Sequence, residues 1–140
     1  MTVAQPPSPF YRVSIKALIF DAKRRVLVVR AKDKGWELPG GGWEHGESMH
    51  HCLRREIMEE LGVGMQHINF TTIYPYSGLN RKGYRTLKLA VPGVVDGQNF
   101  RFGSEVVEAK YVTAQELAVL EMPDDEGGIK THIDRIWSVG

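Results

Sequence analysis

The sequence predicts an α/β fold in which a mixed β-sheet carries helices on both faces. Strand-like and helical segments alternate along the chain, the helical segments differ in length, and the connections are too irregular for a doubly wound parallel sheet. The chain has 140 residues, of which 42% are apolar, and these values suit one globular domain. We therefore expect a flexible, proline-containing leader over residues 1–10 and a single domain over residues 11–140.

The first half of this domain contains two expected strands and one helix. Residues 13–20 and 26–29 are rich in β-branched and aromatic side chains, and the short polar link between them predicts a β-hairpin. Residues 48–61 contain neither Gly nor Pro and are followed by Gly62, which predicts a helix with a glycine at its C-terminal cap.

The second half contains three further strands and two helices. Strands are expected over residues 67–74, 84–91 and 106–112, with a turn-rich loop over residues 75–83. Thr113 is expected to cap a short helix. Apolar residues recur at helical spacing between Ile129 and Trp137 and predict the last helix.

Composition and charge exclude several classes of protein. Eighteen basic and 17 acidic residues leave a net charge of +1, and we expect no nucleic-acid partner because such binding depends on a basic excess. No apolar run approaches the ~18 residues that cross a bilayer, and the first nine residues lack the pattern of a signal peptide. We expect a cytoplasmic protein without membrane association.

Residues 41–63, GGWEHGESMHHCLRREIMEELGV, form the segment with the clearest chemical signal. Glu56, Glu59 and Glu60 are three and four residues apart, so a helix projects their carboxylates from one side. Carboxylate oxygens suit a hard cation such as Mg²⁺ or Mn²⁺, and such ions neutralise a phosphate and acidify a water. The glycine run before the helix lets the backbone approach a ligand closely.

The same segment resembles the Nudix box. Each defining position of that box is present in this chain: Gly41, Glu47, Arg55, Glu56, Ile57, Glu59, Glu60, Gly62 and Val63. Residues 36–40 are similar to the usual lead-in to the box, and the similarity in strand order covers most of residues 11–137. The resemblance implies the Nudix fold, an α/β/α sandwich with a mixed β-sheet flanked by helices.

The resemblance also implies an activity and a set of roles. The protein would be a pyrophosphohydrolase that depends on Mg²⁺ or Mn²⁺. It would split a nucleoside diphosphate linked to another moiety into a nucleoside monophosphate and a phosphorylated product. Glu59 and Glu60 would be the main metal ligands, Glu56 a further ligand or water activator, and Gly40 the source of a carbonyl ligand. Four residues would shape the motif: Gly41, Glu47, Arg55 and Gly62.

The resemblance leaves the general base open among Glu56, Glu59 and Glu105. A downstream acid often joins such a site, and Glu105 is the best match, with Glu108 as the alternative. Arg30 and Arg85 are candidates for binding the anionic substrate because arginine forms bidentate contacts with phosphate. An ordinary surface position is the alternative for both.

Substrate and assembly are the least determined features. The marks of members that act on ADP-ribose, dinucleoside polyphosphates, coenzyme A or NADH are missing, so nucleoside triphosphates and nucleotide sugars remain. A homodimer is possible, as is common in the family. The alternative function is a catalytically silent Nudix-like domain that binds a nucleotide as a sensor. The usual mark of such a domain, loss of the carboxylates, is absent here.

Overall fold

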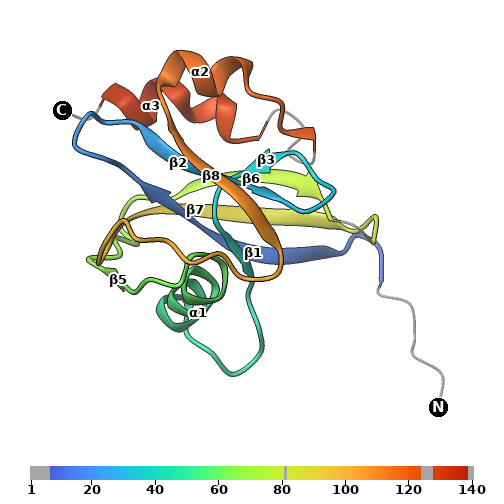
Figure 1. The fold of residues 1–140 in the computed structure, drawn as a ribbon. Coiled ribbons are helices and arrows are strands. Elements are labelled where there is room, and N and C mark those ends of the chain that lie inside the picture. The colour runs from blue at the N-terminus through green and yellow to red at the C-terminus, as the bar shows by residue number, and fades with distance from the viewer. Residues whose placement is uncertain (1–6, 81, 124–127, 139–140) are drawn as a thin grey trace.

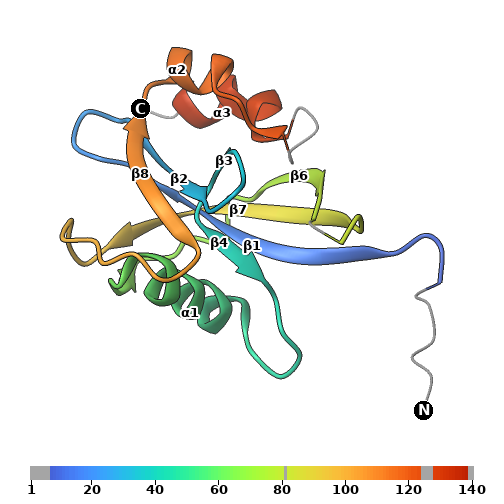
Figure 2. The same ribbon diagram turned by 45° about the vertical axis from the view of Figure 1, so that its right-hand side comes forward.

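The computed structural model describes residues 7–80, 82–123 and 128–138 (Figure 1). Two β-sheets lie between helix α1 on one side and helices α2 and α3 on the other (Figures 1 and 2). This arrangement confirms the predicted α/β class, with a small second sheet in addition to the expected mixed one. The first six residues of the expected leader lie outside the described ranges.

The larger sheet is built on two long strands, β1 (Tyr11–Ile19) and β7 (Arg85–Val95), which pair in parallel. Three shorter strands pair with them in antiparallel fashion: β4 (Gly40–Gly42) on β1, and β5 (Met65–Gln66) and β6 (Tyr74–Leu79) on β7. The smaller sheet is antiparallel and has the order β3 (Trp36–Glu37), β2 (Val26–Ala31), β8 (Val106–Val112).

Helix α1 (Met49–Leu61) begins and ends close to the predicted positions because both caps can be recognised in the sequence. The Ser48 hydroxyl accepts a hydrogen bond from the backbone N–H of His51. Gly62 adopts a left-handed conformation with φ of 68°, and its N–H donates to the carbonyl of Met58. Figure 2 shows β4 beside β1 and the loop that leads from β4 into α1.

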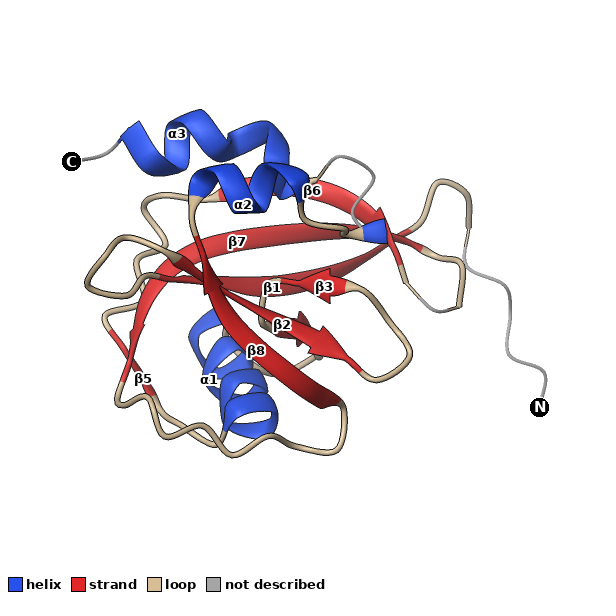
Figure 3. Cartoon of the chain, turned by 45° about the horizontal axis from the view of Figure 1, so that its top comes forward, coloured by secondary structure: helices blue, strands red, loops and turns tan. Residues whose placement is uncertain are grey.

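The helices on the opposite side are short (Figure 3). Helix α2 (Ala114–Val119) starts with a capping box in which Thr113 and Glu116 exchange hydrogen bonds. A 3-10 turn, η2 (Ile129–His132), leads into α3 (Ile133–Ser138). Across the described ranges, no helix is both long and apolar enough to cross a bilayer.

Two apolar clusters pack on the two faces of the larger sheet, because side chains alternate along a strand. On β1, Ile15 and Ile19 belong to the cluster that packs against α1, whereas Leu18 belongs to the cluster beneath α2 and α3. Nearer the start of β1, the face that carries Leu18 becomes polar at Lys16 and Ser14, which are nevertheless buried. This polar region lies beside the candidate site.

The predicted hairpin of residues 13–20 and 26–29 is wrong. The two segments share one isolated antiparallel bridge, between Phe20 and Val26, and β2 then pairs with β3 and β8 in the smaller sheet. Val26, Leu27, Val28 and Val29 are all buried, and they contribute alternately to the two clusters. A strand buried on both faces fits between layers rather than in a half-exposed hairpin.

The predicted strand over residues 67–74 and the predicted loop over residues 75–83 are also wrong. Strand β6 spans Tyr74–Leu79, and the turn is confined to the residues that follow it. Pro75 favoured a loop in the sequence, but β6 lies beside β7 at an edge of the sheet, where a proline is tolerated. Buried and exposed residues alternate along β6, which is the pattern of a strand.

Candidate active site

Helix α1 places the carboxyl groups of Glu56 and Glu60 against the glycine strand β4. The two residues are one helical turn apart and share a helix face. The backbone N–H of Gly40 donates to Oε1 of Glu60 at 2.8 Å. Gly40 has φ of 129°, and a Cβ atom there would lie 2.1 Å from the Ile15 carbonyl oxygen. Glycine is therefore required where β4 passes between the carboxylates and β1.

Burial dominates the electrostatics of this carboxyl pair. It raises the pKa of Glu60 to about 8 and also raises the pKa of Glu56, and the nearby Lys16 offsets part of both effects. The Lys16 Nζ atom donates to the Gly40 carbonyl oxygen at 3.1 Å and lies 3.9 Å from Oε2 of Glu37. Two half-buried acids beside one ammonium group form a region in which a bound cation would stabilise the ionised carboxylates.

Glu59 does not join this pair. Its side chain is 57% exposed, and its Oε1 atom accepts a hydrogen bond from Arg55 at 3.3 Å. One residue along a helix turns the side chain by about 100°, so Glu59 projects away from Glu60. Within the described ranges, no group of three or more His, Cys, Asp or Glu side chains is arranged to hold a metal ion. The expectation that three carboxylates share one side therefore holds for Glu56 and Glu60 and is wrong for Glu59, which faces solvent.

Arg55 and Glu47 connect the loop after β4 to the helix. Arg55 forms two hydrogen bonds with the Glu47 carboxylate, at 2.8 and 3.0 Å, and also donates to Glu56, Glu59 and the carbonyl of Gly42. The bonds from Arg55 lower the pKa of Glu47 to about 2. The structure thus places both residues at the loop–helix junction, where they orient two of the candidate carboxylates.

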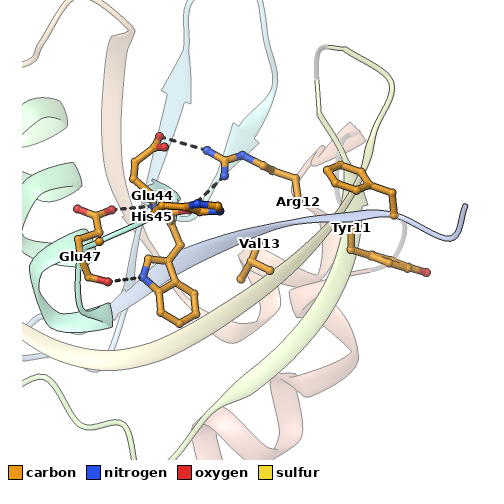
Figure 4. Close-up of a pocket in the computed structure, with 9 residues that line it drawn as sticks. Tyr11, Arg12, Val13, Glu44, His45 and Glu47 are labelled. Atoms are coloured by element: carbon orange, nitrogen blue, oxygen red, sulfur yellow. Dashed lines mark hydrogen bonds and ion pairs between the residues drawn. The ribbon is translucent and has the colours of Figure 1, made fainter. Parts of the chain in front are cut away.

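Further contacts hold this loop to the start of β1 (Figure 4). Arg12 donates to the Trp43 carbonyl and to Glu44, the Trp43 indole N–H donates to the Glu47 carbonyl, and the Glu44 N–H donates to the Glu47 carboxylate. A cavity of about 590 Å³ with mostly apolar walls separates the loop from Tyr11 and its neighbours. These bonds fix the position of Glu47 from several directions.

A smaller cavity of about 180 Å³ lies on the other side of Gly40 and Gly41, and the sequence analysis missed it. Its polar walls include neighbouring positions of β1 and β7, together with residues outside these strands: Ser14, Lys16, Thr86 and Lys88, with Lys34, Glu37 and Asn80. A sequence signal existed, because a sheet covered by helices on both faces has no solvated face. Polar residues in the covered part of such a strand are therefore expected to be buried.

Three further candidates come from strands β2 and β7 and from the segment before β8: Arg30, Arg85 and Glu105. Arg30 donates twice to Glu108 across the β2–β8 ladder, and Arg85 is exposed at the start of β7. Glu105 is exposed and follows a segment that contacts the last turn of α1, where the N–H of Gly103 donates to the carbonyl of Glu60. This placement favours Glu105 over Glu108 as the downstream acid. The roles of Arg30 and Arg85 in substrate binding stay predictions.

The fold and the residues at this site define a family. The family model described as the NUDIX domain matches residues 10–132. The chain belongs to the NUDIX family, and the family predicted from the Nudix box is thereby confirmed.

Individual similar proteins agree with this assignment. An RNA pyrophosphohydrolase of Ruthia magnifica subsp. Calyptogena magnifica is 38% identical over 66 residues, which are 46% of this chain and 37% of that protein. An 8-oxo-dGTP diphosphatase of Buchnera aphidicola subsp. Acyrthosiphon pisum is 39% identical over 57 residues, 39% of this chain and 46% of that protein. The matched segments thus span less than half of each relative.

A solved structure supports the fold over nearly the whole chain. The MutT protein from Methanosarcina mazei Go1 aligns with a TM-score of 0.71 and 20% identity, over 94% of this chain and 96% of that one. At this identity the similarity concerns the fold, and it confirms the predicted arrangement of sheets and helices.

Proposed function

We propose that this protein is a pyrophosphohydrolase that depends on Mg²⁺ or Mn²⁺. Its substrate is a nucleoside diphosphate linked to another moiety, and its products are a nucleoside monophosphate and a phosphorylated remainder. The observation that carries this proposal is the packing of the half-buried Glu56 and Glu60 against the glycine strand, one helical turn apart. The names of the two relatives, a pyrophosphohydrolase and a diphosphatase, support the same reaction class.

The residues present fit a hard divalent cation. Glu56, Glu60 and the carbonyl of Gly40 form a donor set made only of oxygen, which is the set that Mg²⁺ and Mn²⁺ prefer. Glu59 adds a further carboxylate from the same helix, on the solvent side. When bound, the ion supplies neutralisation of the phosphate charge and a more acidic water.

The chain's own residues then perform the proton transfer and the positioning. The oxygen of the attacking water bonds to one phosphorus, and the bridging oxygen leaves with the other phosphoryl group. The proton released by the water passes to a carboxylate, for which Glu56, Glu59 and Glu105 are the candidates. Arg55 orients two of these carboxylates through its hydrogen bonds. Lys16 holds the Gly40 carbonyl in place.

For the oligomeric state, the cellular location and the substrate class, we propose what the sequence predicts. We propose a small nucleotide rather than a nucleic acid as substrate, since the chain carries a net charge of only +1. Arg30 and Arg85 are proposed as outer contacts for this anionic substrate. A homodimer and a cytoplasmic location remain predictions.

A hydrolysis screen tests the proposal and separates it from the sensor alternative. Nucleoside triphosphates, oxidised nucleoside triphosphates, nucleotide sugars and RNA with a 5′-triphosphate are each incubated with Mg²⁺ or Mn²⁺. We expect metal-dependent release of a phosphorylated product from at least one small nucleotide. Nucleotide binding without hydrolysis of any of these compounds would instead support the sensor function.

Replacement of Glu59 supplies the matched variant for this screen. Glu59→Gln should reduce turnover by orders of magnitude and leave folding intact, because its side chain is largely exposed. Asp134→Asn changes another exposed carboxylate, which lies on α3 and outside the candidate site, and should retain the parent rate. An unchanged rate in Glu59→Gln would contradict the role assigned to that carboxylate.

A further inference from the structure

One edge of strand β8 has no neighbouring strand. β8 is the outer strand of the smaller sheet, whose order is β3, β2, β8 (Figure 3). Within residues 7–80, 82–123 and 128–138, β2 is the only strand that pairs with it. Backbone N–H and C=O groups at alternate positions of β8 therefore point away from β2. Such an edge is a template for pairing with another strand.

The sequence of β8 is complementary to itself when two copies run antiparallel with Ala109 at the centre. Each residue then faces the one that lies equally far on the other side of Ala109, and a two-fold axis makes every such contact occur twice. Aliphatic, aromatic and opposite-charge pairs of this kind stabilise adjacent strands. The pairs are Val106 with Val112, Val107 with Tyr111, and Glu108 with Lys110.

The two charged residues of β8 are accessible to a second copy. Lys110 is exposed, and the Glu108 side chain is 49% exposed. Both hydrogen bonds from Arg30 go to Oε1 of Glu108, so Oε2 can accept from a further cation. The Lys110 Nζ atom lies 4.4 Å from the centroid of the Trp36 ring, and no carboxylate of the described residues forms an ion pair with it. Its charge can therefore pair with Glu108 of another copy.

Val107 adds an apolar side chain to this edge. It is 43% exposed. The register of β8 against β2 shifts at this residue, because Arg30 pairs with Glu108 while Ala31 pairs with Val106. A β-bulge of this kind leaves one residue without a partner on the neighbouring strand and re-aims its side chain. Val107 is thus available for contact with Tyr111 of a second copy.

The charges of β8 also select one register of pairing. Charged residues on an edge strand usually prevent association with other strands. An antiparallel pair centred on Glu108 would place two glutamates opposite each other, and one centred on Lys110 would place two lysines opposite each other; both arrangements are destabilising. Only the register centred on Ala109, between the two, joins opposite charges, and its central residue is small.

We propose that two copies of this chain associate through their β8 edges, in an antiparallel pair centred on Ala109. The smaller sheets of the two copies then form one continuous sheet across the two-fold axis. This inference gives the predicted homodimer an interface. The carboxyl pair of the candidate active site belongs to α1, so the association does not depend on the proposed hydrolysis.

Sedimentation of the full chain at concentrations from about 1 µM to about 1 mM, the Kd range of weak association, measures the dimer. Lys110→Glu and Glu108→Lys should each weaken it about ten-fold or more, because each reversal turns two attractive pairs into two repulsive ones. Val107→Asp should also weaken it, without a lower melting temperature, since this side chain is exposed in the single copy. Lys23→Glu makes the same change of net charge on the exposed β1–β2 turn and should dimerise like the parent.

An equimolar mixture of the two charge-reversal variants gives the sharpest result. When a Lys110→Glu chain pairs with a Glu108→Lys chain, each position 108 again faces an opposite charge at position 110. The mixture should therefore regain a dimer that neither variant forms alone, which misfolding of a single variant cannot produce. A parent that is monomeric at about 1 mM, a dimer unchanged in both variants, or a mixture no more associated than its components would each overturn the inference.

Discussion

A Cβ atom at Gly41 would lie 2.5 Å from the Cδ atom of Glu56. The missing side chain of one residue thus makes room for the carboxylate of another, 15 positions later in the chain. The Glu56 side chain projects from helix α1 toward β4. Its carboxylate can occupy this position only because Gly41 has no side chain. The glycine run is therefore part of the candidate site as well as part of the strand.

Gly41→Ala should move the Glu56 carboxylate and reduce hydrolysis and divalent-metal affinity. The expected loss of activity is about 10-fold or more, because displacement of reacting groups by about 1 Å has effects of this size or larger. Gly97→Ala is the control, since a Cβ atom at Gly97 meets no other atom within 4 Å. Equal metal affinity and activity in both variants would show that Glu56 does not need this position.

Arg55→Lys should separate positioning from charge. Lysine keeps the positive charge but cannot form the two parallel bonds to Glu47 while also donating to Glu56 and Glu59. Loss of a group that orients metal ligands typically costs about 10–100-fold in activity or metal affinity. We expect a fall in kcat within this range. A variant with the parent kcat would indicate that the charge of Arg55 is sufficient.

The burial of Glu60 predicts an unusual dependence of stability on pH in the absence of metal. The pKa of this group is about 8 in the folded protein, against 4.5 as the ordinary value. Between these two values, the folded state holds a proton that the unfolded state releases. The free energy of unfolding should therefore decrease as pH rises from 4.5 to 8, by up to about 1.4 kcal/mol per pH unit from this group.

Denaturant unfolding in EDTA across this pH range measures the effect. Glu60→Gln cannot ionise, yet its side-chain oxygen still accepts the bond from Gly40, so the variant should lose part of the slope. Identical slopes for the parent and variant would mean that Glu60 is ionised in the folded protein throughout the range.

The sequence allows prediction of those features that depend on local chemistry. The bounds of α1 follow from a serine and a glycine at its ends, Ser48 and Gly62, and the contact between Glu47 and Arg55 follows from a known motif. The separation of β1 from β2 depends instead on which strands lie beside them. Residues 13–20 and 26–29 look the same locally whether they form a hairpin or enter different sheets.

The basic cavity beside Gly40 and Gly41 was missed for a related reason. Ser14 and Lys88 are adjacent because β1 and β7 pair in parallel with that register, and 74 positions of sequence separate them. Arg30 and Arg85 are expected to bind the substrate because of their chemistry, and this role stays a prediction; Arg30 also pairs with Glu108. The lysines that line the cavity are recognisable only when both faces of the sheet are known to be covered.

The most direct test of the central claim is a titration with Mn²⁺ that monitors the bound ion by electron paramagnetic resonance. The account predicts that the parent protein binds Mn²⁺ and that Glu60→Gln weakens this binding by more than the 10–100-fold typical of outer residues. The Asp134→Asn control should bind like the parent. Equal Mn²⁺ affinity in the parent and in Glu60→Gln would contradict the assignment of this half-buried carboxylate as a metal ligand.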